Sequence, residues 1–168
     1  MTSCSRRITL LLASTLVTIL APMPGADTSQ QSNAGQTNFS GTWRLNREKS
    51  SWRGLRKPIS VIVTIEHKQA AFSYSGSLVD ADGELRNFEF SGFVDGKEHP
   101  ATREYGEGKV ALKWAGSNTL TATFKTSDGE WVETTTRSLS RNGKTLTQQL
   151  RLKAPDREVT WTEVYEKL

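Results

Sequence analysis

The polar residues best suited to chemistry in this chain fall in one predicted row on a β-sheet. Pairing the strand segments through their turns puts Arg137, Gln148 and Glu163 side by side on three successive strands. Neighbouring strands lie ~4.8 Å apart, so the Arg137 guanidinium could reach the Glu163 carboxylate across Gln148. The flanking rows are largely apolar, and a buried charge needs a partner. Such a row could hold the carboxylate or another acceptor of a ligand through Arg137.

Two other interpretations of this row stay open. Arg137 and Glu163 could satisfy each other and merely fix the strand register, or a register error could leave Arg137 outside. The candidate ligand-binding residues are the row and its aromatic neighbours: Arg137, Gln148, Glu163, Tyr165, Trp161 and Trp43.

The sequence carries few signals of catalysis. Glu133 and Glu163 share the inner phase two strands apart, and paired carboxylates can do acid–base work. However, the chain has no nucleophile elbow and no glycine-rich phosphate loop. Its histidines, His67 at a strand end and His99 in a predicted loop, have no acid cluster nearby and make a poor metal site. We expect no enzyme, no metal and no cofactor; an enzyme that uses Glu133 or Glu163 is an alternative.

The elements that must position these residues are short strands. Turn signals recur along the chain, among them Asp128-Gly129 and Asn142-Gly143, which are typical of tight hairpins. The intervening runs mostly alternate, and none has a helical period. The short loops predict an all-β antiparallel up-and-down meander closed into a single barrel, with little or no helix outside the leader. The ten expected strands are 39–45, 59–67, 70–79, 84–93, 100–105, 109–115, 119–126, 130–140, 144–153 and 158–167.

Turn chemistry also predicts the register of the last four strands. Two-residue loops at Asp128-Gly129 and Asn142-Gly143 and a four-residue loop at 154–157 put the apolar phases of four strands on one face. The segment 84–93 spoils this pattern, since its aromatic residues fall on both phases. A bulge or a strand buried on both faces is expected there.

The N-terminal residues are typical of a secretory signal peptide. Arg6-Arg7 precedes an apolar run from Ile8 to Leu20 and a small-residue end. We place cleavage after Ala26, with Ala21 as the alternative; general secretion and twin-arginine export both stay open. The predicted organisation is a signal peptide over 1–26, a flexible polar linker over 27–38 and a barrel domain over 39–168.

Removing the leader changes the composition. It takes away Cys4 and two arginines but no acidic residue, so the formal net charge falls from +4 to +2. Disulfides and thiolate metal sites are then excluded, and a weak charge without a basic stripe argues against nucleic-acid binding. No segment approaches the ~20 apolar residues of a membrane span. The protein is expected in the periplasm or secreted, as a monomer.

The segment Phe39-Ser40-Gly41-Thr42-Trp43-Arg44-Leu45 carries a family resemblance. Its Gly41-Thr42-Trp43 resembles the first strand of calycin-type barrels (lipocalins, fatty-acid-binding proteins and avidins), in which the Trp plugs one end. Over 39–168 the chain resembles exported bacterial lipocalin-like proteins. The resemblance implies an arginine across Trp43, for which Arg151 and Arg157 are the candidates.

The chain also departs from these families. The segment 46–58 is too short for the helix pair of fatty-acid-binding proteins, and the end of the chain has neither the helix nor the disulfide of typical lipocalins. Within 46–58, Trp52 could cover a barrel end as a lid or be an exposed contact.

These patterns predict an exported, non-catalytic binding or carrier protein for a small hydrophobic ligand with an acidic head group. The alternative is a filled barrel that serves as a protein–protein interaction or inhibitor module of the cell envelope. Four tryptophans on predicted inner phases could fill a small barrel: Trp43, Trp114, Trp131 and Trp161. An unfilled interior favours the carrier, and a packed interior favours the module.

Overall fold

A computed structural model describes residues 36–103 and 106–168, all within the unit Asn33–Leu168. The predicted signal peptide and residues 27–35 of the predicted linker lie outside these ranges. Of the linker's last residues, Thr37 donates its backbone N–H to the carbonyl of Ser117 at 3.0 Å. No helix of the described residues is long and apolar enough to cross a membrane.

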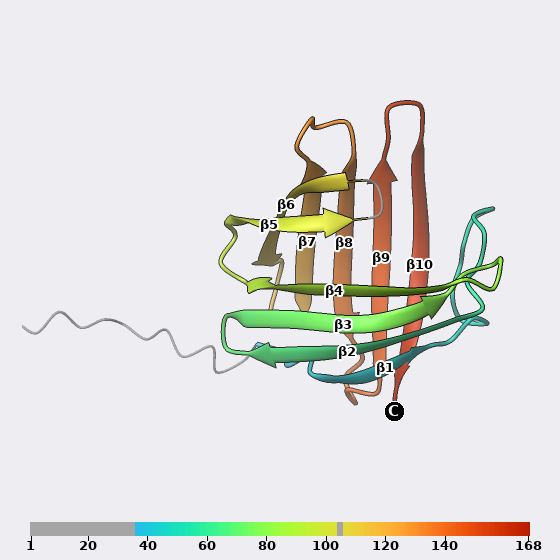
Figure 1. Ribbon diagram of the computed structural model, residues 1–168. Helices are drawn as coiled ribbons and strands as arrows, with labels where there is room; N and C mark the ends of the chain where they lie inside the picture. Colours follow the sequence, from blue (N-terminus) through green and yellow to red (C-terminus); the bar gives the residue numbers. More distant parts are fainter. Residues whose placement is uncertain (1–35, 104–105) are drawn as a thin grey trace, which may run out of the picture. The chain divides into compact units, whose positions relative to one another are not determined.

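The described residues form ten antiparallel strands and no helix, which confirms the all-β prediction. Their order in the sheet is β4-β3-β2-β1-β10-β9-β8-β7-β6-β5. In Figure 1, β1–β4 cross in front of β7–β10. The strands are β1 (Gly41–Leu45), β2 (Ser60–Lys68), β3 (Ala71–Val79), β4 (Leu85–Phe93), β5 (Glu98–Arg103), β6 (Gly106–Trp114), β7 (Thr119–Thr126), β8 (Val132–Leu139), β9 (Thr145–Lys153) and β10 (Glu158–Lys167).

The sheet is a nearly closed barrel because its first and last strands pair. Trp43 lies opposite Lys167, and Leu45 lies opposite Tyr165, in an antiparallel ladder. This pairing confirms that the last strand closes on the first. Closure gives the sheet an inner face, and the apolar residues that alternate along each strand point toward it.

The barrel keeps one open seam, between β4 and β5, which are the two ends of the sheet. The predicted meander implies that each strand pairs with the next, and this was wrong for β4 and β5. The connecting turn is attached elsewhere: Val94 donates its N–H to Ala70, and Gly96 donates its N–H to Leu112. In addition, Pro100 leaves β5 without one backbone N–H, a residue suited to an edge strand.

The predicted register of β7–β10 is confirmed. Leu120 lies opposite Arg137, Arg137 opposite Gln148, and Gln148 opposite Glu163. The predicted two-residue loops were wrong, because the N–H groups of Thr126 and Ser140 donate to the carbonyls of Trp131 and Thr145 and close four-residue loops over 127–130 and 141–144. Within these loops, only the glycines, Gly129 and Gly143, take left-handed φ angles, +76° and +66°; a four-residue loop in place of a two-residue one keeps the same register. Arg137 is only 8% exposed, so the alternative that placed it outside is excluded.

The predicted bulge or double burial at 84–93 was wrong. β4 pairs with β3 as a regular ladder of nine residues. Phe88 and Phe90 face inward, whereas Leu85 and Phe93 are 66% and 52% exposed. A strand of a single-sheet barrel has only one face to bury, so its outward apolar residues stay in solvent.

The end of the barrel near the 140–144 turn, here called the closed end, is tightly packed. Trp43 is completely buried, and its Nε1 donates to the carbonyl of Phe39 at 3.1 Å. The ammonium of Lys167 lies 5.2 Å from the Trp43 ring centroid and donates to the carbonyl of Ser40 at 2.9 Å. This lysine fills the role that the resemblance assigned to Arg151 or Arg157. That assignment was wrong: Arg151 pairs with Glu158 at the surface, and Arg157 is exposed.

A close approach between β6 and β7 makes Gly108 sensitive to substitution. A Cβ atom at Gly108 would overlap the backbone carbonyl of Lys125, which cannot move without distorting the ladder. At Gly92, by contrast, it would meet only the end of the Phe90 ring. We expect Gly108→Ala to lower the free energy of unfolding by about 2 kcal/mol and Gly92→Ala to lower it much less. Urea denaturation measures both, and equal losses would contradict the explanation.

Candidate ligand-binding site

The inner face of the barrel is filled at the closed end but not at the other. Trp43, Leu120 and Leu146 have no exposed surface. Toward the 154–157 turn, inward-facing Leu150 and Trp161 are only half-buried, as are Leu78, Phe88, Leu152 and Val159. Since these side chains point into the barrel, their partial exposure means that this end of the barrel is open to solvent. We call this accessible interior the lumen.

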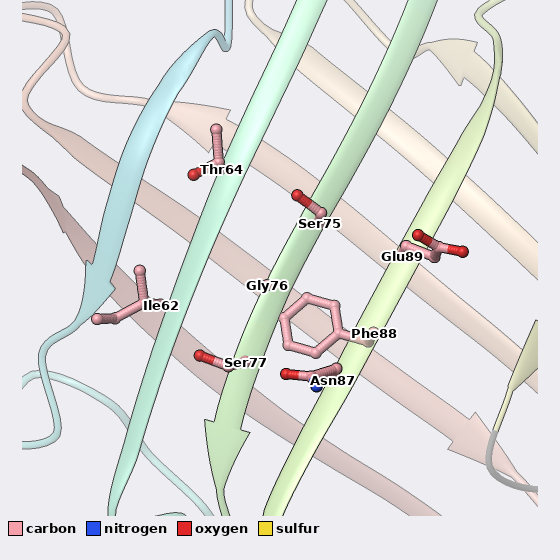
Figure 2. Close-up of a pocket in the computed structure, with 8 residues that line it drawn as sticks. All are labelled: Ile62, Thr64, Ser75, Gly76, Ser77, Asn87, Phe88 and Glu89. Atoms are coloured by element: carbon pink, nitrogen blue, oxygen red, sulfur yellow. The ribbon is translucent and has the colours of Figure 1, made fainter.

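Two hollows of the described surface lie on the β2–β5 side of the barrel. One, of about 570 Å³, lies over the outward residues of β2–β4, with the Phe88 ring beside Gly76 (Figure 2). It contains none of the predicted site residues. The other, of about 580 Å³, lies along the seam between Phe90 and Pro100 and reaches Tyr74, whose register places it on the inner face.

Arg137 carries the strongest sign of a missing partner. Its Nη1 is buried and has no hydrogen-bond partner. The guanidinium lies 5.9 Å from the Phe72 ring centroid and 5.4 Å from that of Tyr74. Burial lowers the pKa of Arg137, because the charged form loses its solvent. The side chain is therefore a buried cation with an unused donor.

The carboxyl of Glu163 is held by its own strand. Trp161 Nε1 donates to Glu163 Oε1 at 3.0 Å, and the Tyr165 hydroxyl donates to Oε2 at 2.7 Å. Burial raises the pKa of Glu163, and the hydrogen bonds from Tyr165 and Trp161 oppose this rise. Burial and the nearby Glu163 also raise the pKa of Tyr165 well above its usual value. Trp161, Glu163 and Tyr165 are named the Glu163 cluster below.

Arg137 and Glu163 do not pair, although the register makes them neighbours across Gln148. Among the described residues, no ion pair or hydrogen bond joins the two side chains. Gln148 is buried between them in the ladder. The interpretation in which Arg137 and Glu163 satisfy each other therefore does not hold.

A second arginine, missed by the sequence analysis, approaches the same place. Arg103 Nη2 donates to the Tyr74 hydroxyl at 2.8 Å, and its guanidinium lies 5.4 Å from the Phe124 ring centroid. The positive charge of Arg103 also helps to lower the pKa of Arg137. Arg103 and Arg137, called the arginine pair below, thus meet on Tyr74 from β5 and β8. The alternation of inward and outward residues along β5 could have predicted that Arg103 faces the barrel interior. Its contact with Tyr74 could not be predicted, because it crosses the seam where β4 and β5 do not pair.

The remaining candidates lie apart from this region. Trp43 belongs to the closed end, beneath Lys167. Glu133 accepts a hydrogen bond from Thr135 at 3.2 Å. Trp52 packs against the hydrophobic core, and its loop is tied to β10 by reciprocal backbone hydrogen bonds between Ser51 and Thr162. These contacts favour a structural cover over an exposed contact.

The histidines are structural in their surroundings. His67 is buried rather than at the rim, and its Nδ1 accepts the Phe39 N–H at 3.4 Å. Burial lowers the pKa of His67. His99 lies in β5, not in the expected loop, with Nε2 3.0 Å from Asp95 Oδ1. In the part of the chain described here, no three His, Cys, Asp or Glu residues gather as metal ligands.

The buried charge of Arg137, whose Nη1 has no hydrogen-bond partner, should destabilise the fold. We expect Arg137→Met to raise the free energy of unfolding of the ligand-free protein by about 2 kcal/mol, because the variant keeps an unbranched side chain and removes a buried cation. Urea denaturation tests this. Arg151→Met, at an exposed ion pair, is the matched control and should change little; a loss of stability in Arg137→Met would refute the explanation.

Glu163 predicts a specific pH dependence. Its pKa is raised in the folded protein, so its contribution to stability is present below the unfolded pKa and is lost as pH rises through the folded value. We expect the wild type to lose stability relative to Glu163→Gln as the pH rises above about 4, the usual pKa of a glutamate. Denaturant titrations at several pH values measure this difference, and a constant difference would contradict it.

Comparison with known proteins shows the fold alone. No family model matches the chain, and no curated protein matches its sequence. The chain is similar in fold to the extracellular fatty-acid-binding protein As-p18 (TM-score 0.58, 18% identity, 80% of this chain and 99% of that one). It is also similar to a Schistosoma mansoni fatty-acid-binding protein in complex with arachidonic acid (0.55, 15%, 80% and 98%). A third similar structure is zebrafish ileal bile-acid-binding protein complexed with cholic acid (0.53, 14%, 79% and 100%). These similarities support the predicted antiparallel barrel fold.

Proposed function

We propose that this protein is a non-catalytic carrier that binds a small hydrophobic molecule with an acidic head group in its lumen. The observation that carries the proposal is the buried Arg137 Nη1 without a hydrogen-bond partner. An unsatisfied buried donor is costly, and a ligand carboxylate would satisfy it with a charge-assisted bond. The names of two similar structures, in complex with arachidonic acid and cholic acid, support acidic amphiphiles as the ligand class.

The arginine pair adds to this argument. Arg103 and Arg137 bring two positive charges to Tyr74, and like charges repel strongly away from water. An anion between them would offset this repulsion. The apolar inner residues near the 154–157 turn would contact the hydrocarbon part of the ligand, while its acidic head group binds the arginine pair.

The expected affinity follows from the buried hydrocarbon. Each methylene taken from water contributes ~0.8 kcal/mol, so an acyl chain of about 12 carbons gains roughly 9 kcal/mol before ordering costs. A Kd on the order of micromolar follows. The filled-barrel alternative has less support, because inward-facing Leu150 and Trp161 are only half-buried.

The place of action is also part of the proposal. The pattern of residues 1–26 supports export to the periplasm or the medium, and these residues lie outside the described ranges.

Arg137→Leu tests the anchor. Dodecanoic acid and 1-dodecanol share a chain length but differ in charge, so loss of the guanidinium should weaken the acid by about tenfold or more and the alcohol by much less. Displacement of a fluorescent probe measures both affinities. Arg151→Leu, on the outer face, is the control. Equal losses for acid and alcohol would sink the anchor, and no binding of either ligand by the wild type would sink the carrier.

A further inference from the structure

Two opposite charges in one row of the barrel stay apart. Arg137 and Glu163 flank Gln148 on adjacent strands. The Arg137 guanidinium nevertheless lies against Phe72 and Tyr74 of β3, a strand that is not hydrogen-bonded to β8. Arg137 therefore reaches across the lumen, while Glu163 is held on β10 by Trp161 and Tyr165. The interior therefore presents a cationic donor and a carboxyl group that do not pair but lie close enough for the charge of Arg137 to oppose the rise that burial causes in the pKa of Glu163.

The Glu163 carboxyl has unused acceptor capacity. A carboxylate offers about four acceptor positions, and one hydrogen bond reaches each oxygen, from Trp161 and from Tyr165. Its side chain is half-buried and faces the lumen, whereas Arg137 is buried. A ligand that reaches this carboxyl group can therefore donate a hydrogen bond to it.

A fatty acid without a further polar group would bind this interior less favourably, because its carboxylate would lie near other acidic groups. Its carboxylate would bind near Glu163, and Glu133 adds a second acidic group on the inner phase of β8. Like charges interact unfavourably at low dielectric. A hydroxyl, amide N–H or ammonium beside the ligand carboxylate would face Glu163 and turn this repulsion into a hydrogen bond.

We propose that Glu163 is a specificity-determining residue that selects acidic amphiphiles carrying a hydrogen-bond donor close to the acid. The inference rests on the proposed carrier function and deepens it by naming the ligand class. Arg137 binds the acid, Glu163 binds the donor, and Gln148 lies between the two.

The test compares three acids of equal chain length: dodecanoic, 2-hydroxydodecanoic and 2-aminododecanoic acid. The wild type should bind the hydroxy and amino acids about tenfold more tightly than the plain acid, the effect of one hydrogen bond to a charged group. Glu163→Met should reduce this preference to within about twofold and bind the plain acid at least as well as the wild type does. Probe displacement gives the affinities, and circular dichroism checks the fold.

Two further variants complete the design. Glu166→Met, on the outer face of the same strand, should keep the wild-type preference. Glu163→Gln removes only the charge, so the amino acid should lose more of its advantage than the hydroxy acid; this variant also covers the case in which Glu163→Met does not fold. Equal binding of all three acids by the wild type would overturn the selectivity and leave the carrier proposal standing. A preference that survives in both Glu163 variants would also overturn the selectivity, and failure of all three acids to bind would overturn both proposals.

Discussion

The antiparallel pairing of β1 with β10 gives the sheet an inside, and the other features of the molecule depend on it. Trp43 lies opposite Lys167 at this junction, where the lysine ammonium covers the indole ring. Because this closure joins the two ends of the chain, the opening moves to β4 and β5 in the middle of the sequence. The inner phases of all ten strands then face one another, and any polar side chain on those phases loses solvent.

Burial of Arg137 inside the closed barrel lowers the stability of the fold. A buried guanidinium with an unpartnered nitrogen opposes folding, and the packed aromatic and aliphatic residues of the closed end must offset it. In the proposed function, the same unused donor binds the anionic head group of the ligand. Stability and binding therefore oppose each other at this residue, as is common where a protein keeps a polar group for a ligand.

The half-buried inner face and the Glu163 cluster complete this description. Inward-facing Leu150 and Trp161 offer apolar surface, while Glu163 and the arginine pair offer groups of opposite charge. A lumen that served hydrocarbon alone would need neither charge. In the two proposals, these groups bind a polar head group with two kinds of hydrogen-bonding atoms.

Much of this molecule follows from the sequence alone. Asp128-Gly129 and Asn142-Gly143 determine local turns, and turns determine the register of the strands beside them, so the row Arg137, Gln148 and Glu163 could be predicted. The all-β class follows from the same alternating pattern. These features depend on residues near one another in the chain, and both turn conformation and hydrophobic periodicity can be predicted from such local sequence.

The tertiary structure decided what meets across the barrel. Sequence patterns did not place the seam between β4 and β5, the lysine over Trp43 or the approach of Arg103 to Tyr74. Nor did they show that Arg137 turns away from Glu163 toward β3. Such contacts depend on the curvature of the closed sheet and on the directions of long side chains. Neither is encoded in the spacing of residues along a strand.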